Sequence, residues 1–170
     1  MTPTIYPISG PTTQHRTPTL PSGTSLAEAR AYVQDNLESG TVCPCCDRYA
    51  QVYRRRINKG QGESLIRLYH LGRASAEGWV HVRDLGAESR EEGKLVHWGL
   101  VEEGSTKPDG GRGGYWRITD LGREFVTGIR AVPKYIWMYN ATPLKVDDTE
   151  LVTIVDVLDD QFRYAELMAP

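Results

Sequence analysis

The 170-residue sequence contains no long apolar run, and this absence excludes one class of protein at the outset. A transmembrane helix needs roughly 20 consecutive apolar residues, and no stretch of the chain approaches that length. The N-terminal stretch MTPTIYPISGPTTQHRTPTLPSG also lacks the basic start and apolar centre of a signal peptide. We therefore expect a cytoplasmic protein with no membrane partner.

Cysteine is scarce, and the common catalytic signatures are missing. The chain has three cysteines, all between residues 43 and 46. In a reducing compartment these are free thiols or metal ligands rather than a disulfide framework. The sequence holds no G-x-x-x-x-G-K-[ST] phosphate loop, no G-x-S-x-G nucleophile elbow and no H-E-x-x-H motif. We therefore expect a binding protein rather than an enzyme.

The stretch GTVCPCCDRYAQ allows three interpretations. Cys43 and Cys46 have the C-x-x-C spacing of a zinc knuckle, but a structural zinc site needs four ligands. This leaves His70, His81 and His97 as candidates to complete it. A redox pair requires the motif at the start of a helix that follows a strand, and that context is absent. The favoured interpretation is a tight turn whose small apolar cysteines pack against the core, with zinc as the alternative.

The net charge of −2 conceals an uneven distribution. Residues 1–47 carry a net charge of −2, residues 48–130 carry +4, and residues 131–170 carry −4. A basic middle between two acidic ends favours a nucleic-acid surface, although the excess of +4 is modest.

Composition and periodicity divide the chain into four parts. The first part holds five prolines among many threonines and has no packed face, as in a flexible arm. A helix follows, with a capping box at Ser25 and Glu28 and a glycine C-cap at Gly40. The four parts are the arm (1–23), an N-terminal helix with the cysteine turn and a basic segment (24–61), a winged-helix domain (62–128) and an acidic β-rich appendage (129–170).

The order of elements in the third part predicts a winged helix. A short helix is expected at the end of this third part, and Thr119 is placed to cap it. Thr153 is placed to cap another short helix in the appendage. We therefore predict an α+β fold: a winged helix-turn-helix core with an N-terminal helix and a small β-rich C-terminal appendage. Helices are expected at 63–75, 83–88 and 89–98, a first strand at 79–82, and wing strands at 100–103 and 114–118.

The predicted third helix has a basic outer face. If Leu95 and Trp98 pack inward, a step of 100° per residue leaves basic side chains on the opposite side. Glu91 and Glu92 act against contact with phosphates because they carry the same charge sign. The outward basic set comprises Arg90, Lys94 and His97.

Two further basic groups extend the predicted DNA contact. Lys107 and Arg112 lie in the glycine-rich stretch GSTKPDGGRGG, as on wings that touch a backbone or a minor groove. Arg54, Arg55 and Arg56 form the densest basic stretch and are predicted as flanking phosphate contacts. The alternative for this stretch is a strand whose arginines are solvated or paired with the acidic C-terminal segment.

Several motifs, in a fixed order, resemble an uncharacterised family of small bacteriophage proteins. They are CPCCDRYAQVYRRRIN, WVHV, KLVHWGLVEE, GYWRITDLGREFVTG, VPKYIWMYN and FRYAELM, and they cover about residues 40–168. The family has no established activity, so the resemblance implies a phage or prophage origin and little chemistry. The helix-wing-helix order is also similar, at the level of fold alone, to MarR-type transcriptional regulators.

These features predict a phage-encoded winged-helix protein that binds double-stranded DNA as a regulator or accessory factor in the host cytoplasm. Charge reversal at Arg90 and Lys94 is expected to abolish DNA binding without unfolding the domain. The rival hypothesis is a protein–protein interaction module that binds a host protein, with acidic surfaces that mimic DNA. Winged-helix regulators commonly form homodimers, but no heptad pattern here demonstrates one.

Overall fold

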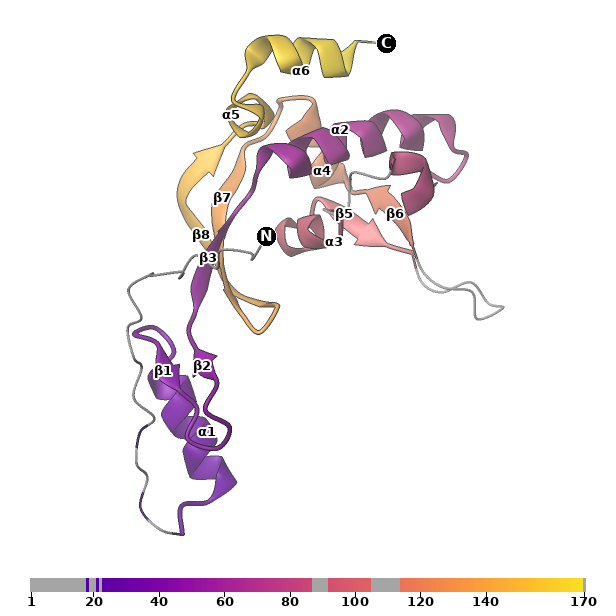
Figure 1. Ribbon diagram of the computed structural model, residues 1–170. Coiled ribbons are helices and arrows are strands. Elements are labelled where there is room, and N and C mark those ends of the chain that lie inside the picture. The colour runs from indigo at the N-terminus through magenta and orange to yellow at the C-terminus, as the bar shows by residue number, and fades with distance from the viewer. Residues whose placement is uncertain (1–17, 19–20, 22, 87–91, 105–113, 170) are drawn as a thin grey trace, which may run out of the picture. The chain divides into compact units, whose positions relative to one another are not determined.

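The protein has a mixed α+β fold, as predicted, in a computed structural model that describes residues 18, 21, 23–86, 92–104 and 114–169 (Figure 1). The chain forms two compact units, residues 1–52 and residues 53–170, and each is described by itself. Within these described ranges, no helix is both long and apolar enough to cross a membrane.

The first unit consists of one helix and a small hairpin. Helix α1 (Leu26–Asp35) begins at the predicted capping box, in which the Ser25 side chain accepts from the Glu28 N–H and the Glu28 carboxylate accepts from the Ser25 N–H. The expected C-cap at Gly40 is wrong, because the helix already ends at Asp35 with Asn36 as its cap. The hairpin pairs β1 (Thr41–Val42) with β2 (Tyr49–Ala50).

Gly40 has a different role, set by a positive φ and a close approach. Its φ is +81°, and a Cβ atom there would lie 2.0 Å from the Tyr49 hydroxyl oxygen. Because the Tyr49 hydroxyl is the end of a side chain that can move, the positive φ is the stronger reason for glycine at this point.

The second unit is built on helix α2 (Lys59–Ala74). The helix begins before the predicted residue 63 because Asn58 and Gln61 form a second capping box. It also runs across residue 62, where the sequence analysis placed a domain boundary. Leu65 and Leu68 on its inner face are fully buried.

A three-stranded antiparallel sheet with short helices packs against α2. The strand order is β4-β6-β5, and β5 and β6 are the two predicted wing strands. The second helix, expected at 83–88, is a single 3-10 turn that ends at Gly86, where φ is +90°. The elements are β4 (Val80–His81), the 3-10 helix η1 (Val82–Leu85), α3 (Glu92–Leu95), the 3-10 helix η2 (Val96–Trp98), β5 (Val101–Glu103), β6 (Tyr115–Ile118) and α4 (Asp120–Val126).

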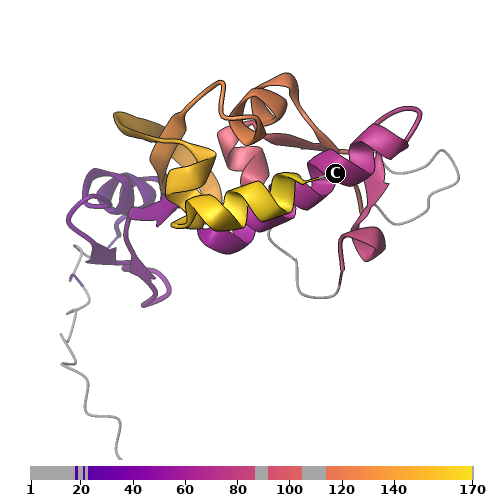
Figure 2. The same cartoon turned by 90° about the horizontal axis from the view of Figure 1, so that it is seen from above.

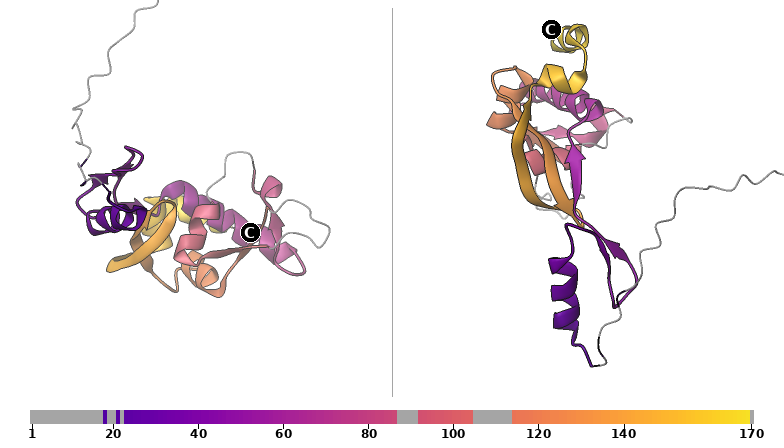
Figure 3. Two further views of the ribbon diagram at one scale, coloured as in Figure 1. Left: turned by 90° about the horizontal axis from the view of Figure 1, so that it is seen from below. Right: turned by 90° about the vertical axis from the view of Figure 1, so that its left-hand side faces the viewer.

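A second antiparallel sheet joins the basic segment to the C-terminal appendage. Its order is β3-β7-β8, so the central strand of the appendage pairs with the arginine stretch (Figure 3). Helix α6 runs beside α2 (Figure 2), where His70 Nε2 donates to the Leu167 carbonyl oxygen over 2.8 Å. The elements are β3 (Tyr53–Arg56), β7 (Val132–Tyr139), β8 (Thr142–Val152), α5 (Ile154–Leu158) and α6 (Gln161–Met168).

The start of α4 supplies a test of this packing. A Cβ atom on Gly122 would lie 2.2 Å from the Leu100 carbonyl oxygen and 2.7 Å from Ile118 Cγ1. Because backbone cannot move aside cheaply, Gly122→Ala should lower the free energy of unfolding by about 1–3 kcal/mol. The measurement is denaturant unfolding followed by circular dichroism.

Gly60 provides the matched control for this substitution. It lies in the first turn of α2, and a Cβ there would meet its nearest atom, Asn58 Oδ1, at an ordinary 3.4 Å. Gly60→Ala should therefore leave stability unchanged or raise it by up to about 1 kcal/mol. Equal stability of the two variants would contradict the packing described for α4.

Candidate nucleic-acid interface

Helix α3 and the 3-10 helix η2 place their side chains largely as the sequence predicts. Leu95 is fully buried, Trp98 is 7% exposed, and the Trp98 Nε1–H donates to the Pro133 carbonyl oxygen over 2.7 Å. On the opposite side, Lys94 and His97 are half-buried rather than fully exposed. This segment is thus anchored by one face and presents two basic side chains on the other.

The sequence predicts that Glu92 repels phosphates at the surface, but its side chain is buried. Its side chain is 2% exposed, and its carboxylate accepts a hydrogen bond from the Ser64 hydroxyl of α2 over 2.9 Å. The carboxylate therefore joins α3 to α2 and is withdrawn from the surface. This contact removes one of the two acidic groups expected beside Lys94.

The three consecutive arginines divide between two faces of β3. Side chains alternate along a strand, and Arg55 lies opposite Ile136, whose side chain is fully buried. On this side Arg55 approaches His97, and it lowers the pKa of His97 below 6.5 in addition to the larger effect of burial. Tertiary structure thus brings Arg55 and His97 together from distant parts of the chain.

Arg54 lies on the other face and has a paired partner. Its guanidinium carbon is 3.9 Å from the ring centroid of Tyr135 and 5.4 Å from that of Trp137. One of its terminal nitrogens is 3.1 Å from Asp147 Oδ2. Pairing with the acidic C-terminal segment, the alternative interpretation of this stretch, is therefore confirmed for Arg54. Arg56 is exposed on the same face, opposite Tyr135.

Three of the predicted DNA-contacting residues cannot be placed. Arg90 lies in the segment 87–91, and Lys107 and Arg112 lie in the segment 105–113. Both segments are outside the described residues, and the three side chains remain predictions.

The cysteines lie on the turn of the β1–β2 hairpin. The Cys43 N–H donates to the Arg48 carbonyl oxygen over 2.8 Å, and the Asp47 N–H donates to the Cys43 carbonyl oxygen over 2.9 Å. Cys43 is half-buried, whereas Cys45 and Cys46 are exposed. The predicted turn is confirmed, but packing of its cysteines against the core is wrong for the exposed pair.

The pKa values of the Cys43 and Cys45 thiols are shifted in opposite directions in this turn. Hydrogen bonds from the backbone N–H of Cys45 and from Cys46 lower the pKa of the Cys43 thiol. Loss of water contact, together with the Cys43 sulfur, raises the pKa of Cys45. Of Cys43 and Cys45, Cys43 is therefore the thiol that ionises more readily.

Among the described residues, the structure does not supply the two further ligands that a zinc site at Cys43 and Cys46 needs. Over the described ranges of the chain, no three His, Cys, Asp or Glu side chains gather in a way that could hold a metal ion. The candidate histidines have other contacts: His70 donates to the Leu167 carbonyl, and His81 lies edge-on to Tyr115 and accepts from the Arg83 N–H. Two thiols fall short of the four ligands of a structural zinc site.

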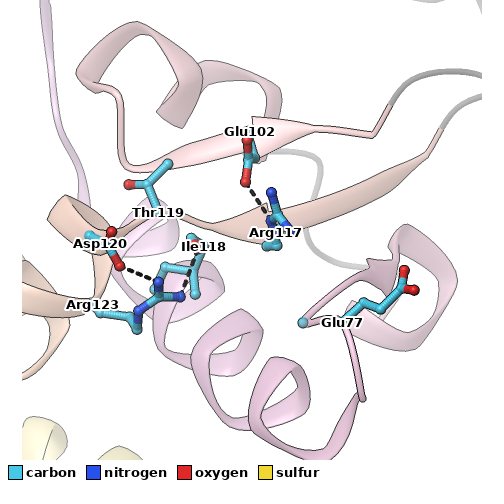
Figure 4. Close-up of a pocket in the computed structure, with 8 residues that line it drawn as sticks. Glu77, Glu102, Arg117, Ile118, Thr119, Asp120 and Arg123 are labelled. Carbon is cyan, nitrogen blue, oxygen red and sulfur yellow. Dashed lines mark hydrogen bonds and ion pairs between the residues drawn. The ribbon is translucent and has the colours of Figure 1, made fainter.

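A hollow beside β5, β6 and the start of α4 is lined by charged groups (Figure 4). Its two arginines are engaged, because Arg117 pairs with Glu102 and Arg123 pairs with Asp120. The Arg117 guanidinium also lies 4.5 Å from the ring centroid of Trp79. These pairs offset the positive charge of both arginines in the hollow. The lining residues are Glu77, Gly78, Glu102, Arg117, Ile118, Thr119, Asp120 and Arg123.

Sequence reasoning missed the aromatic row of β7. Tyr135, Trp137 and Tyr139 alternate with Ile136 and Met138, which are both fully buried, and the three rings therefore share the opposite face. Aromatic and aliphatic residues alternate with a period of two in KYIWMYN, and this alternation would have predicted that the three rings share one face. Trp98 packs inward, as the interpretation of the third helix requires, whereas Trp137 is only half-buried.

Comparisons with known proteins gave no match, whether with protein-family models, with curated proteins or with solved structures.

The electrostatic effect of Arg55 on the pKa of His97 supplies a test by titration. Arg55→Gln removes a positive charge beside the imidazole, and the pKa of His97 should then rise toward its ordinary 6.5. Because the folded-state pKa is lowered, His97 opposes folding once the unfolded chain binds the proton, and this loss of stability appears as the pH falls below about 6.5. The measurement is an NMR titration of the histidine ring signals.

Arg54→Gln is the matched control, since Arg54 lies on the opposite face of the same strand. It should leave the His97 titration unchanged. A rise of similar size in both variants, or no rise in Arg55→Gln, would contradict the placement of Arg55.

Proposed function

We propose that residues 59–126 form a winged helix and that the protein binds double-stranded DNA through α3, η2 and the β5–β6 wing. The observation that supports the proposal is that Lys94 and His97 lie half-buried on a segment anchored by the buried Leu95 and Trp98. In winged helices and related folds, the corresponding helix enters the major groove. The order of helices and the β4-β6-β5 sheet also support this assignment.

Two further contacts favour an interface with phosphates. Arg55 adds a guanidinium beside His97, and guanidinium groups bind phosphate oxygens in a bidentate manner. The burial of Glu92 against Ser64 removes a carboxylate that would repel them. Arg90, Lys107 and Arg112 would extend the same interface if they lie as the sequence predicts.

The biological setting of the proposal comes from the sequence. The resemblance of the motifs to small bacteriophage proteins supports a phage or prophage origin, and a role as a regulator or accessory factor follows from that origin together with duplex binding. On this proposal the chain acts without catalysing a reaction.

The proposal is tested by fluorescence anisotropy of a labelled mixed-sequence duplex, titrated with the full chain over a series of salt concentrations. Phosphate contacts release counterions, so the affinity should fall steeply with salt on a log–log plot. Lys94→Gln should weaken binding and make that slope shallower by about 1, the contribution of one phosphate contact.

Arg73→Gln is the control for loss of one positive charge. Arg73 lies at the far end of α2, where its guanidinium stacks 5.7 Å from the Tyr69 ring centroid. It should leave the salt slope unchanged. No binding of the duplex at low salt, or equal slopes for both variants, would overturn the proposed interface.

A protein–protein interaction module remains the second candidate, and the exposed edge of β8 favours it. β8 is the outer strand of the β3-β7-β8 sheet, and Leu144, Val146 and Leu151 on it are 54%, 47% and 57% exposed. Exposed apolar residues on an edge strand are typical of a surface that pairs with another chain. A complex formed through such a surface would keep its affinity over the salt series that weakens DNA binding.

A further inference from the structure

The face of the β3-β7-β8 sheet opposite to Ile136 and Met138 carries aromatic and cationic side chains together. Tyr135, Trp137 and Tyr139 occupy alternate positions of the central strand β7. The register places Arg56 opposite Tyr135, and it places Arg54 and Lys145 opposite Trp137. This aromatic sheet face comprises Tyr135, Trp137 and Tyr139 of β7, Arg54 and Arg56 of β3, and Lys145 of β8.

The charges of the aromatic sheet face are only partly neutralised. Arg54 pairs with Asp147 across the sheet, and Lys134, whose Nζ lies 5.4 Å from the Tyr135 ring centroid, pairs with Glu150. Arg56 and Lys145 are both exposed, opposite Tyr135 and Trp137 respectively. Arg56 and Lys145 thus add two exposed cations to this face beside the paired Arg54, and the face keeps an excess of positive charge.

We propose that the aromatic sheet face binds a single-stranded segment of nucleic acid. Bases would stack on Trp137 and on the layer formed by the Arg54 guanidinium over the Tyr135 ring, since both aromatic rings and guanidinium planes accept bases. Phosphates would lie along Arg56 and Lys145. Aromatic platforms bordered by cations are the recurring means of binding unpaired strands without sequence preference.

The spacing of the rings selects a single strand over a duplex. Side chains two residues apart on a strand are separated by about 7 Å, which is roughly twice the 3.4 Å between successive bases of a duplex strand. Bases on Tyr135 and Trp137 would therefore be unstacked from each other. In a duplex their ring faces are covered by neighbouring base pairs, whereas an unpaired strand exposes them.

This inference is independent of the proposed duplex interface. Arg55, which acts on His97 of the proposed duplex interface, lies on the other face of the sheet, because it alternates with Arg54 and Arg56. Substitutions on each surface therefore separate the two activities.

The experiment is fluorescence anisotropy of labelled dT20 and U20, which have no self-pairing, with the full chain at low salt. We expect binding of at least one of the two oligonucleotides, and the tighter of them identifies DNA or RNA as the source of the strand. Trp137→Leu should weaken this binding about tenfold through loss of one stacked base. Trp137→Phe keeps a ring and should retain most of the affinity.

A gain-of-affinity variant separates recognition from misfolding. Asp147→Asn removes the carboxylate that pairs with Arg54 and should tighten binding of the oligonucleotide, which a misfolded chain would not do. The matched control is Arg73→Gln, a cation beside a tyrosine on α2, which should bind as the unmodified chain does.

Several results would overturn the inference. They are no binding of either oligonucleotide, equal affinity of Trp137→Leu and the unmodified chain, or weaker binding by Asp147→Asn at an unchanged melting temperature. Loss of duplex binding in Lys94→Gln with dT20 binding unchanged would support two separate surfaces. If only the duplex experiment fails, these variants still test the single-strand inference.

Discussion

Burial of one apolar face of helix α2 is the constraint on which the second unit depends. Leu65 and Leu68 are fully buried, and the helix packs against strands of the β4-β6-β5 sheet, against α3 and α4, and against the C-terminal helices α5 and α6. The capping box of Asn58 and Gln61 satisfies backbone groups at the helix start, so the first turn can be buried together with the rest. Because Glu92 bonds to Ser64 of this helix, the position of α3 also follows from α2.

The alternation of side chains along β3 divides one basic stretch between two surfaces. Arg55 faces His97, whereas Arg54 and Arg56 face the aromatic rings of β7. A helix in the same place would have spread three consecutive residues over about 200° of its circumference. The strand instead gives two opposite faces, and this is why one run of three arginines supports two distinct proposals.

Several carboxylates of the C-terminal part form ion pairs or helix caps within the fold. Asp147 pairs with Arg54, Glu150 pairs with Lys134, and the Asp156 carboxylate accepts from the Thr153 N–H at the start of α5. Caps and internal pairs hold these carboxylates in place and neutralise nearby cations. Part of the net charge of −4 is therefore offset by cations of the same fold or engaged in helix capping.

The sequence by itself determined the local elements and their order. The capping boxes at Ser25 and Thr153, the Thr119 cap and the strands β5 and β6 follow short-range patterns, and all of them are present in the structure. The early start of α2 was missed because Gly60 and Gly62 weaken a helical pattern that the cap and the packing of the helix stabilise.

Only the tertiary structure decided which distant residues meet. The pairing of β3 with β7 joins residues some eighty positions apart, and no local spacing encodes that register. This pairing places Arg54 over Tyr135. Separate tertiary contacts bring Arg55 near His97 and withdraw Glu92 from the surface through its bond to Ser64. Local preferences depend on neighbours within a few residues, whereas these contacts arise when separate apolar faces are buried together.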